Sequence, residues 1–187
     1  MRIIGGELGG RRLSAPEGEA TRPMLDRVRE AMFSTLQPWL PGAVVLDLFA
    51  GSGSLGIEAL SRGAKHACFV ERGAPAYKCL RANLMELSLT EKSETMRSDA
   101  LDRDAWGELA YDIVFFDSPY PLLDELALRH ALFWAITELV TKRCAPEGVL
   151  VFHAPLHKVL TGEFAPGLVV RERAYGSNAL WYVQRDE

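Results

Sequence analysis

Short apolar runs that alternate with helical segments constrain the fold of this chain more than any other feature. The apolar runs have the length of buried strands. Strands are expected at 43–49, 66–71, 94–99, 111–117 and 148–154, and helices at 55–63, 75–87 and 122–143. Strands that alternate with helices are typical of a doubly wound, mostly parallel sheet. The closing segment GLVVRERAYGSNALWYVQR predicts a hairpin that turns at Gly176–Asn178. We therefore expect an α/β fold of Rossmann-like type: a seven-stranded, mostly parallel sheet with an antiparallel C-terminal hairpin.

The segment before the first strand predicts an extension of the sheet domain. Its first twenty residues are rich in glycine and arginine, which suggests a short hairpin or an irregular arm. A helical pattern then begins at Thr21, with Pro23 suited to a first turn, and Pro38 ends it. Its apolar face is expected to hold Leu25, Val28, Met32 and Leu36. We therefore expect an N-terminal arm and helix over residues 1–40, packed on a main domain over residues 41–187.

Charge and cysteine usage narrow the class of protein. The chain has 21 basic and 25 acidic residues and a net charge of −4, which argues against a protein that binds nucleic acid through a broad positively charged surface. Residues 1–30 have a different charge balance, with six arginines and five acids, so this segment can form a small basic region on an otherwise acidic protein. Three cysteines without C-x-x-C spacing indicate buried thiols in a reducing cytoplasm.

No metal site and no membrane association are expected. The cysteines and histidines lack the ligand spacing of zinc sites. They are Cys68, Cys79, Cys144, His66, His130, His153 and His157. The longest apolar runs are far below the ~18 residues of a membrane span. The N-terminus carries no apolar block followed by a small-residue cleavage site, so the sequence predicts a cytoplasmic protein.

A carboxylate stands at or near the end of each of the first four strands. These residues are Asp47, Glu71, Asp99 and Asp117. Ligands of doubly wound sheets collect beyond the carboxyl ends of the strands, so these acids are candidate binding or catalytic groups. The alternative for each is structural, because acids after strands often cap the next helix, and Asp99 could be only a cap.

The loop GSGSLG after the first strand matches a nucleotide-binding fingerprint. Its glycines let a ligand approach the backbone closely, and Glu71 follows Gly51 by twenty residues. The loop fits NAD and equally S-adenosylmethionine, whose ribose also presents two hydroxyls to an acid. Asp47 and Phe49 precede Gly51 and Gly53 and place a carboxylate where the ammonium of a bound amino acid could meet it. The chain is also too short for the substrate domain of a dehydrogenase, so S-adenosylmethionine is favoured.

The tetrapeptide DSPY after the fourth strand suits methyl transfer to the exocyclic amine of a base. Such an amine is a poor nucleophile because its lone pair is delocalised into the ring. The Asp117 carboxylate and the Ser118 main-chain carbonyl can accept its N–H bonds and aim that lone pair. Pro119 fixes the turn, and Tyr120 offers a ring on which a flipped-out base stacks. A core role for Tyr120 and a hydrolase nucleophile at Ser118 are the weaker alternatives, the latter because no G-x-S-x-G elbow surrounds it.

These residues resemble the (D/N)PP(Y/F) and glycine-loop motifs of nucleic-acid amino-methyltransferases. Further segments extend the resemblance from end to end: MRIIGG, RPMLDRVREAMF (22–33), LDLFAGSGSLGIEALSRGA (46–64) and YGSNALWY (175–182). Together they are similar to the bacterial 16S rRNA (guanine(966)-N(2))-methyltransferase family, small-subunit methyltransferase D. The segment RPxxDRVRE is far more specific than any glycine loop. The similarity is weakest at about 88–110 and 121–147.

The resemblance implies a role for each matching residue. Asp47, Phe49, Gly51 and Gly53 would border the methionine end of the cofactor, Glu71 the ribose hydroxyls and Asp99 the adenine amine. Asp117, Ser118, Pro119 and Tyr120 would form the guanine site, and Arg22, Asp26, Arg27 and Arg29 would lie near the cofactor mouth or the RNA. Arg27 and Arg29 cannot both face one way, being two apart on a helix. Ser118 departs from the usual proline, which keeps the carbonyl but loosens the backbone, and Glu71–Arg72 stands where relatives often have a longer acidic pair.

The sequence thus predicts methyl transfer from S-adenosylmethionine to guanine N2 of 16S rRNA within a small-subunit particle. A first alternative is an amino-methyltransferase that acts on adenine N6 or on another RNA or DNA site; mapping the modified nucleotide separates the two. A second alternative is a decayed enzyme that serves as an RNA-binding or assembly protein, with Ser118 as the mark of lost activity. Calorimetry with S-adenosylmethionine tests it, and binding of NADH in the same experiment tests a reductase, the most distant alternative.

Overall fold

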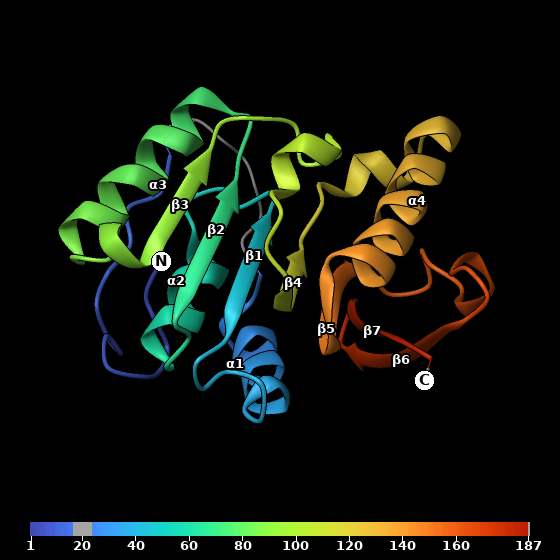
Figure 1. Ribbon diagram of the computed structural model, residues 1–187, viewed down its shortest axis with the longest axis horizontal. Coiled ribbons are helices and arrows are strands. Elements are labelled where there is room, and N and C mark those ends of the chain that lie inside the picture. The colour runs from blue at the N-terminus through green and yellow to red at the C-terminus, as the bar shows by residue number, and fades with distance from the viewer. Residues whose placement is uncertain (17–23, 187) are drawn as a thin grey trace.

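The computed structural model describes residues 1–16 and 24–186 (Figure 1). Its helices are α1 (Asp26–Leu36), α2 (Ser54–Ser61), α3 (Ala74–Glu86) and α4 (Leu126–Lys142). Its strands are β1 (Val44–Leu48), β2 (His66–Val70), β3 (Ser93–Met96), β4 (Tyr111–Phe116), β5 (Cys144–Pro155), β6 (Leu168–Tyr175) and β7 (Asn178–Arg185). Single turns of 3₁₀ helix are η1 (Thr90–Lys92), η2 (Arg103–Trp106), η3 (Tyr120–Leu123) and η4 (Thr161–Glu163).

The strands form one seven-stranded sheet in the order β3-β2-β1-β4-β5-β7-β6. Strands β1 to β5 pair in parallel, and β7 runs antiparallel between β5 and β6. The order reverses between β1 and β4, the position at which doubly wound sheets bind their ligands. The predicted fold class is therefore confirmed, including the antiparallel hairpin and the short N-terminal extension.

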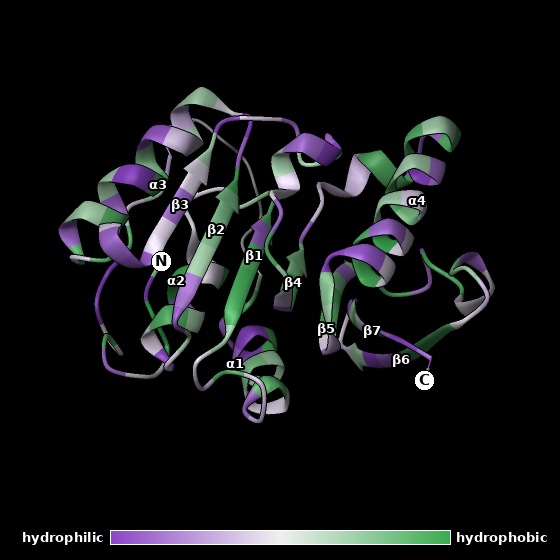
Figure 2. Ribbon diagram, in the orientation of Figure 1, coloured by the Kyte–Doolittle hydropathy of each residue, from purple (hydrophilic) through white to green (hydrophobic). Residues whose placement is uncertain are grey.

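Side chains from the two faces of the sheet form two separate cores. One face packs on α1, α2 and α3, and the other packs mainly on α4 and η2. In Figure 2 the ribbons of β1 and β2 are largely apolar, because both faces of these strands are covered, whereas the helices carry both apolar and polar residues. Strands that are covered on both faces need nearly continuous apolar runs. For this reason the segments AVVLDLF and DIVFFD can be recognised as strands from the sequence.

The first sixteen residues form an arm that crosses α2 and α3. A short antiparallel bridge joins Arg2 and Arg12. The fully buried carboxylate of Glu58 in α2 accepts the amide protons of Ile4 at 2.7 Å and Gly5 at 2.8 Å. Asn83 in α3 donates to the carbonyl oxygens of Ser14 and of Ser52 in the glycine loop. The arm is thus tied to the loop that follows β1, while the division of the chain at residue 40 stays a prediction.

The structure corrects three details of the expected elements. Thr21 and Pro23 lie outside the described residues, and Leu25 precedes α1 and is 47% exposed instead of joining its apolar face. The helical stretch at 122–143 divides into η3 and α4, because Glu125 has an extended backbone. Strand β5 begins at Cys144, ahead of the expected 148, with a register shift against β4.

Candidate functional site

Five neighbouring strands each place one polar residue on the face of the sheet that packs against α1 and α2. They are Glu71 after β2, Asp47 in β1, Asp117 after β4, His153 in β5 and Asn178 in β7. Each lies two positions from a core residue of that face: Phe69, Val45, Phe115, Val151 and Leu180. Because side chains alternate along a strand, the row lies together at the carboxyl edge of the parallel strands.

Glu71 joins the loops that follow β1 and β2. One carboxylate oxygen accepts the amide proton of Gly51 at 2.8 Å, and the other accepts that of Gly73 at 2.6 Å. A carboxylate held by two backbone N–H groups has a fixed orientation beside the glycine loop. Glu71 therefore ties the glycine loop to the start of α3.

The three glycines of the loop have different surroundings. Gly51 has φ 57°, and a Cβ atom there would meet no atom within 4 Å. At Gly53 a Cβ would lie 2.4 Å from Leu80, and at Gly56 2.3 Å from Phe69. Gly53 and Gly56 therefore allow α2 to pack on β2 and α3, whereas Gly51 leaves open space in which a ligand can approach the backbone.

Asp47 is 1% exposed, and its carboxylate accepts the amide proton of Gly56 at 2.8 Å. Burial raises the pKa of Asp47 well above its usual value; the hydrogen bond from Gly56 opposes this, and the charges of Asp117 and Glu71 add to it. The negative charges of Asp117 and Glu71 thus act on the buried Asp47 carboxylate. In this structure Asp47 holds the start of α2 against β1.

Phe49 and Asp99 flank this row. Phe49 has a φ of 59°, and its ring packs edge-on against Phe116 with centroids 5.3 Å apart. Asp99 follows β3 by three residues, accepts the amide proton of Leu101 at 3.0 Å and pairs with Arg72 at 3.1 Å. It does not cap η2, because Asp102 occupies that position.

Residues 117–120 turn back toward the row. Asp117 is partly exposed and lies 2.8 Å from His153 Nδ1, and Tyr120 donates its hydroxyl proton to Asn178 at 2.9 Å. Ser118 is 2% exposed, and among the described residues its hydroxyl has no hydrogen-bond partner. Pro119 is exposed and opens η3.

His153 and Asn178 were missed as site residues by the sequence analysis. Ligand spacing treats His153 only as a possible metal ligand, and the hairpin pattern treats Asn178 only as a turn residue. Two signals were available: His153 stands near the end of a predicted strand, like the four acids, and Asn178 lies within the segment YGSNALWY, which carried part of the family resemblance.

The polar residues of α1 divide between the surface and the interior. Arg29 is 1% exposed; its guanidinium donates to the Arg2 carbonyl at 2.5 Å and to Asp26 at 3.1 Å, and burial lowers its pKa. Asp26 also pairs with Arg2 at 3.5 Å and so ties the arm to α1. Arg27 is exposed and reaches the hairpin tip, where its Nη2 would lie 3.0 Å from a Cβ at Gly176. Arg22 lies outside the described residues.

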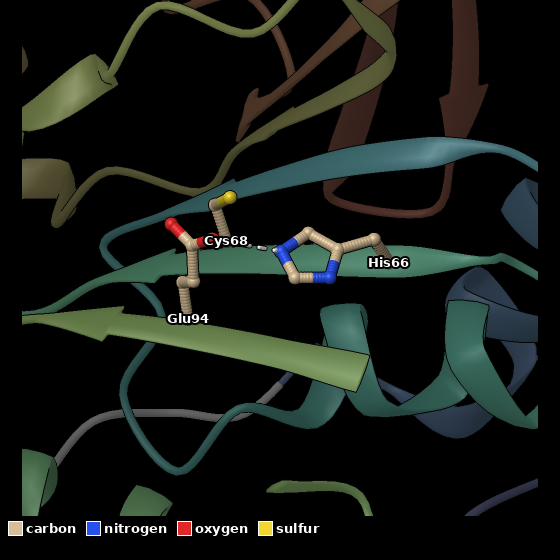
Figure 3. Close-up of side chains that lie close together, drawn as sticks. All are labelled: His66, Cys68 and Glu94. Carbon is tan, nitrogen blue, oxygen red and sulfur yellow. Dashed lines mark ion pairs between the residues drawn. The ribbon is translucent and has the colours of Figure 1, made fainter. Parts of the chain in front are cut away.

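A second cluster lies at the opposite end of the sheet (Figure 3). His66 and Cys68 of β2 and Glu94 of β3 bring their nitrogen, sulfur and oxygen atoms within 4.8 Å of one another. Residues two apart on a strand share a face, and Cys68 pairs directly with Glu94, so this grouping depends on strand pairing and is not visible as ligand spacing in the sequence. His66 and Glu94 are 3.5 Å apart, and burial raises the pKa of Cys68 to about 11.

Among residues 1–16 and 24–186, no helix has the length and apolar character that crossing a membrane requires.

Comparisons with known proteins agree with the resemblance drawn from the motifs. The family model described as conserved hypothetical protein 95 matches residues 1–184. The chain is 45% identical over 123 residues to a candidate rRNA methyltransferase of Bacillus subtilis, covering 64% of this chain and 67% of the relative. It is 41% identical over 120 residues to ribosomal RNA small subunit methyltransferase D of Escherichia coli K12, covering 64% of this chain and 60% of the relative. A solved structure of a candidate methyltransferase from Escherichia coli superimposes with a TM-score of 0.83 at 29% identity, covering 100% of this chain and 98% of the other.

Proposed function

The chain belongs to the family described as conserved hypothetical protein 95, and on that premise we propose that it transfers a methyl group from S-adenosylmethionine to guanine N2 of 16S rRNA. The matched sequence spans about two thirds or less of the curated relatives, so their activity is carried over as a proposal. The observation that carries the proposal is that three carboxylates lie on one face of the sheet, on neighbouring strands. Asp47 of β1 lies between Glu71, which follows β2 and orders the glycine loop, and Asp117, which follows β4 and begins the DSPY corner.

The residues at the glycine loop fit S-adenosylmethionine. The open side of Gly51 gives room for a ligand against the backbone, and the Glu71 carboxylate beside it offers oxygens to a ribose diol. Asp99, fixed by Leu101 and Arg72, is the proposed partner of the adenine amine. Asp47 is the proposed source of negative charge near the methionine ammonium, and Phe49 borders the same end.

The corner at 117–120 is the proposed guanine site. When bound, S-adenosylmethionine would supply a methyl group carried on a positively charged sulfur. The guanine nitrogen would form a bond to the methyl carbon as the S–C bond breaks, with the electron pair of the S–C bond left on sulfur. The methylated amine would then lose a proton. Asp117 and the Ser118 carbonyl would accept the amine N–H bonds and orient the nitrogen lone pair. Pro119 would hold the turn, and Tyr120 would stack on the base. Asp117 can pass the released proton to water.

The RNA side of the proposal involves α1 and the arm. Arg27 is exposed and lies next to the hairpin that carries Asn178, which suits contact with a phosphate near the target base. Arg2, Arg11 and Arg12 are also exposed on the arm. Arg29 is excluded from the contacting set, because its guanidinium is buried. With a net charge of −4, much of the affinity would come from shape and from the context of a small-subunit particle in the cytoplasm.

Incubation with radiolabelled S-adenosylmethionine and unmodified small-subunit particles tests this function. We expect label in the rRNA, mapped to a guanine N2, and none with an Asp117→Ala variant that still binds the cofactor by calorimetry. Label on adenine N6 would replace the substrate while keeping the chemistry. Cofactor binding without label anywhere, with a family member active in parallel, would refute enzymatic activity.

A further inference from the structure

A network of four side chains fixes the corner at 117–120, and two of its members come from β5 and β7. His153 Nδ1 lies 2.8 Å from Asp117 Oδ1. His153 Nε2 lies 3.1 Å from Asn178 Oδ1 and 3.2 Å from the Tyr120 hydroxyl. The Tyr120 hydroxyl donates to Asn178 Oδ1, and the Tyr120 and His153 rings meet edge-on at 5.7 Å. One histidine therefore links the carboxylate and the aromatic ring assigned to the substrate.

The sheet holds this histidine in place. His153 is 5% exposed and pairs with Leu180 in β7, and Asn178 pairs with Pro155 of the same strand as His153. Strand β5 pairs in parallel with β4 up to Phe116, the residue before Asp117. Side chains on strands are placed more accurately than side chains on loops. The geometry therefore suits a group that orients its neighbours.

The partners of the imidazole indicate its protonation state. Nδ1 faces a carboxylate oxygen, which only accepts, and Nε2 faces an amide oxygen, which also only accepts. An imidazole between two acceptors is satisfied when both nitrogens carry protons. Burial lowers the pKa of His153, but the hydrogen bond and charge of Asp117 and the hydrogen bond of Asn178 outweigh burial and raise it.

The titratable groups that contact this ring are Asp117 at the end of β4 and Tyr120 of η3. On the neighbouring elements, Asp47 of β1 interacts electrostatically with Asp117, Tyr175 pairs with Asn178 in the hairpin, and Arg27 of α1 reaches Gly176. Helix α4 packs on the opposite face of β5, where it contacts apolar residues. Asp117 is the partner that can stabilise a positive ring.

We propose that His153, fixed by Asn178, is a positioning residue: its protonated ring holds Asp117 by Oδ1, so that Oδ2 faces the exocyclic amine of a flipped-out base, and it sets the plane of Tyr120 on which that base stacks. This inference rests on the proposed function and adds a residue to its site. A carboxylate paired in this way orients the amine during methyl transfer, and it takes up the released proton only afterwards, before passing it to water.

Three variants test the positioning role: His153→Ala, His153→Asn, whose amide nitrogen replaces Nδ1, and the control His130→Ala on the exposed side of α4. We expect His153→Ala to lower kcat about 100-fold, the cost of misplacing a reacting group by ~1 Å, with KM for particles and Kd for S-adenosylmethionine within about threefold. His153→Asn should recover part of kcat. The control should match the wild type.

The pH profile gives a readout that a merely structural role would not change. Wild-type kcat should fall as the pH rises through the imidazole midpoint measured by NMR, and His153→Asn should lack that alkaline limb. A kcat of His153→Ala within about threefold of wild type, or an imidazole midpoint at or below about 6.5, would overturn the inference. If the wild type methylates no RNA, the NMR midpoint with and without Asp117→Asn still decides: a fall in the variant supports the network, and no change rejects it.

Discussion

Gly51 and Glu71 are hydrogen-bonded although they follow different strands: the Gly51 amide donates to Glu71 Oε2 at 2.8 Å. Strands β1 and β2 pair in parallel with Leu48 opposite Val70, so the loops that follow them begin at the same level of the sheet. The second Glu71 oxygen accepts from the amide of Gly73, the residue that directly precedes α3. The glycine loop is therefore ordered by the same carboxylate that is proposed to bind the ribose.

Replacement of this carboxylate should weaken cofactor binding. In Glu71→Gln one amide N–H₂ group would face a backbone N–H donor, and the charged acceptor for the ribose hydroxyls would be lost. We expect calorimetry to show an affinity for S-adenosylmethionine about 10- to 100-fold lower, the range of one or two charge-assisted hydrogen bonds. The matched control is Glu86→Gln at the exposed end of α3. Equal affinities of Glu71→Gln and wild type would remove Glu71 from the cofactor site.

Asp47→Asn should separate stability from binding. The folded-state pKa of Asp47 is raised, chiefly by burial, so stability that is present below its unfolded pKa is lost as the pH rises through the folded pKa. An amide can still accept the Gly56 proton and does not titrate. Thermal unfolding from about pH 4 to about pH 8 should therefore show the variant gaining a few degrees in Tm over wild type with rising pH.

Cofactor affinity of the same variant tests the role proposed for Asp47. If the carboxylate also attracts the methionine ammonium, Asp47→Asn should bind S-adenosylmethionine more weakly while being more stable at neutral pH. The exposed Asp104→Asn should change neither property. Unchanged affinity would leave Asp47 with a structural role only.

The sequence could predict the sheet and the acids because both depend on local pattern. Strand β4 is a largely apolar run, and because the carboxyl ends of parallel strands share one edge of a sheet, the sequence alone predicts that Asp117 and the glycine loop lie at the same edge. The same rule puts His153 at this edge of the sheet, but it does not reveal the partners of this residue. Its role depends on β7 lying between β5 and β6, which brings Asn178 next to it, and such pairing is not encoded in either strand alone.

Helix phase shows the same limit. Because Arg27 and Arg29 are two residues apart on a helix, their side chains must point in different directions. Only the position of the N-terminal arm, whose Arg2 carbonyl accepts a hydrogen bond from Arg29, shows which of the two is buried. Likewise His66 and Cys68 shared a face by strand alternation, yet the register that adds Glu94 comes from the pairing of β2 with β3.

Ser118→Ala tests whether the main-chain carbonyl, and not the hydroxyl, serves the reaction. The hydroxyl is buried without a hydrogen-bond partner among the described residues, so its removal should raise the free energy of unfolding by about 1 kcal/mol. Because the carbonyl is retained, kcat should stay within about twofold of wild type in the methylation assay. A tenfold loss of kcat in a fully folded variant would mean that the hydroxyl itself contacts the substrate.

Cobalt titration tests the cluster of His66, Cys68 and Glu94. Burial raises the pKa of Cys68 to about 11 and outweighs the opposing effect of Tyr111, so the thiolate that a metal requires is disfavoured. We expect Co²⁺ at micromolar excess to give no thiolate charge-transfer band in the near ultraviolet. A saturable band that disappears in Cys68→Ser would show that the cluster binds metal.

Arg27→Ala and Arg29→Ala form a matched pair on one helix. Arg27 is exposed beside the hairpin tip, so its loss should raise KM for particles several-fold, weaken the salt dependence of binding and leave Tm unchanged. Arg29 is buried and donates hydrogen bonds to the Arg2 carbonyl and to Asp26, so its loss should lower Tm by roughly 4–12 °C, if these two charge-assisted hydrogen bonds together contribute about 2–3 kcal/mol in a chain of this size. At a temperature where Arg29→Ala is folded, its KM should match wild type. A KM effect confined to Arg29→Ala would reverse the assignment of the two side chains, and with it the face of α1 that meets the RNA.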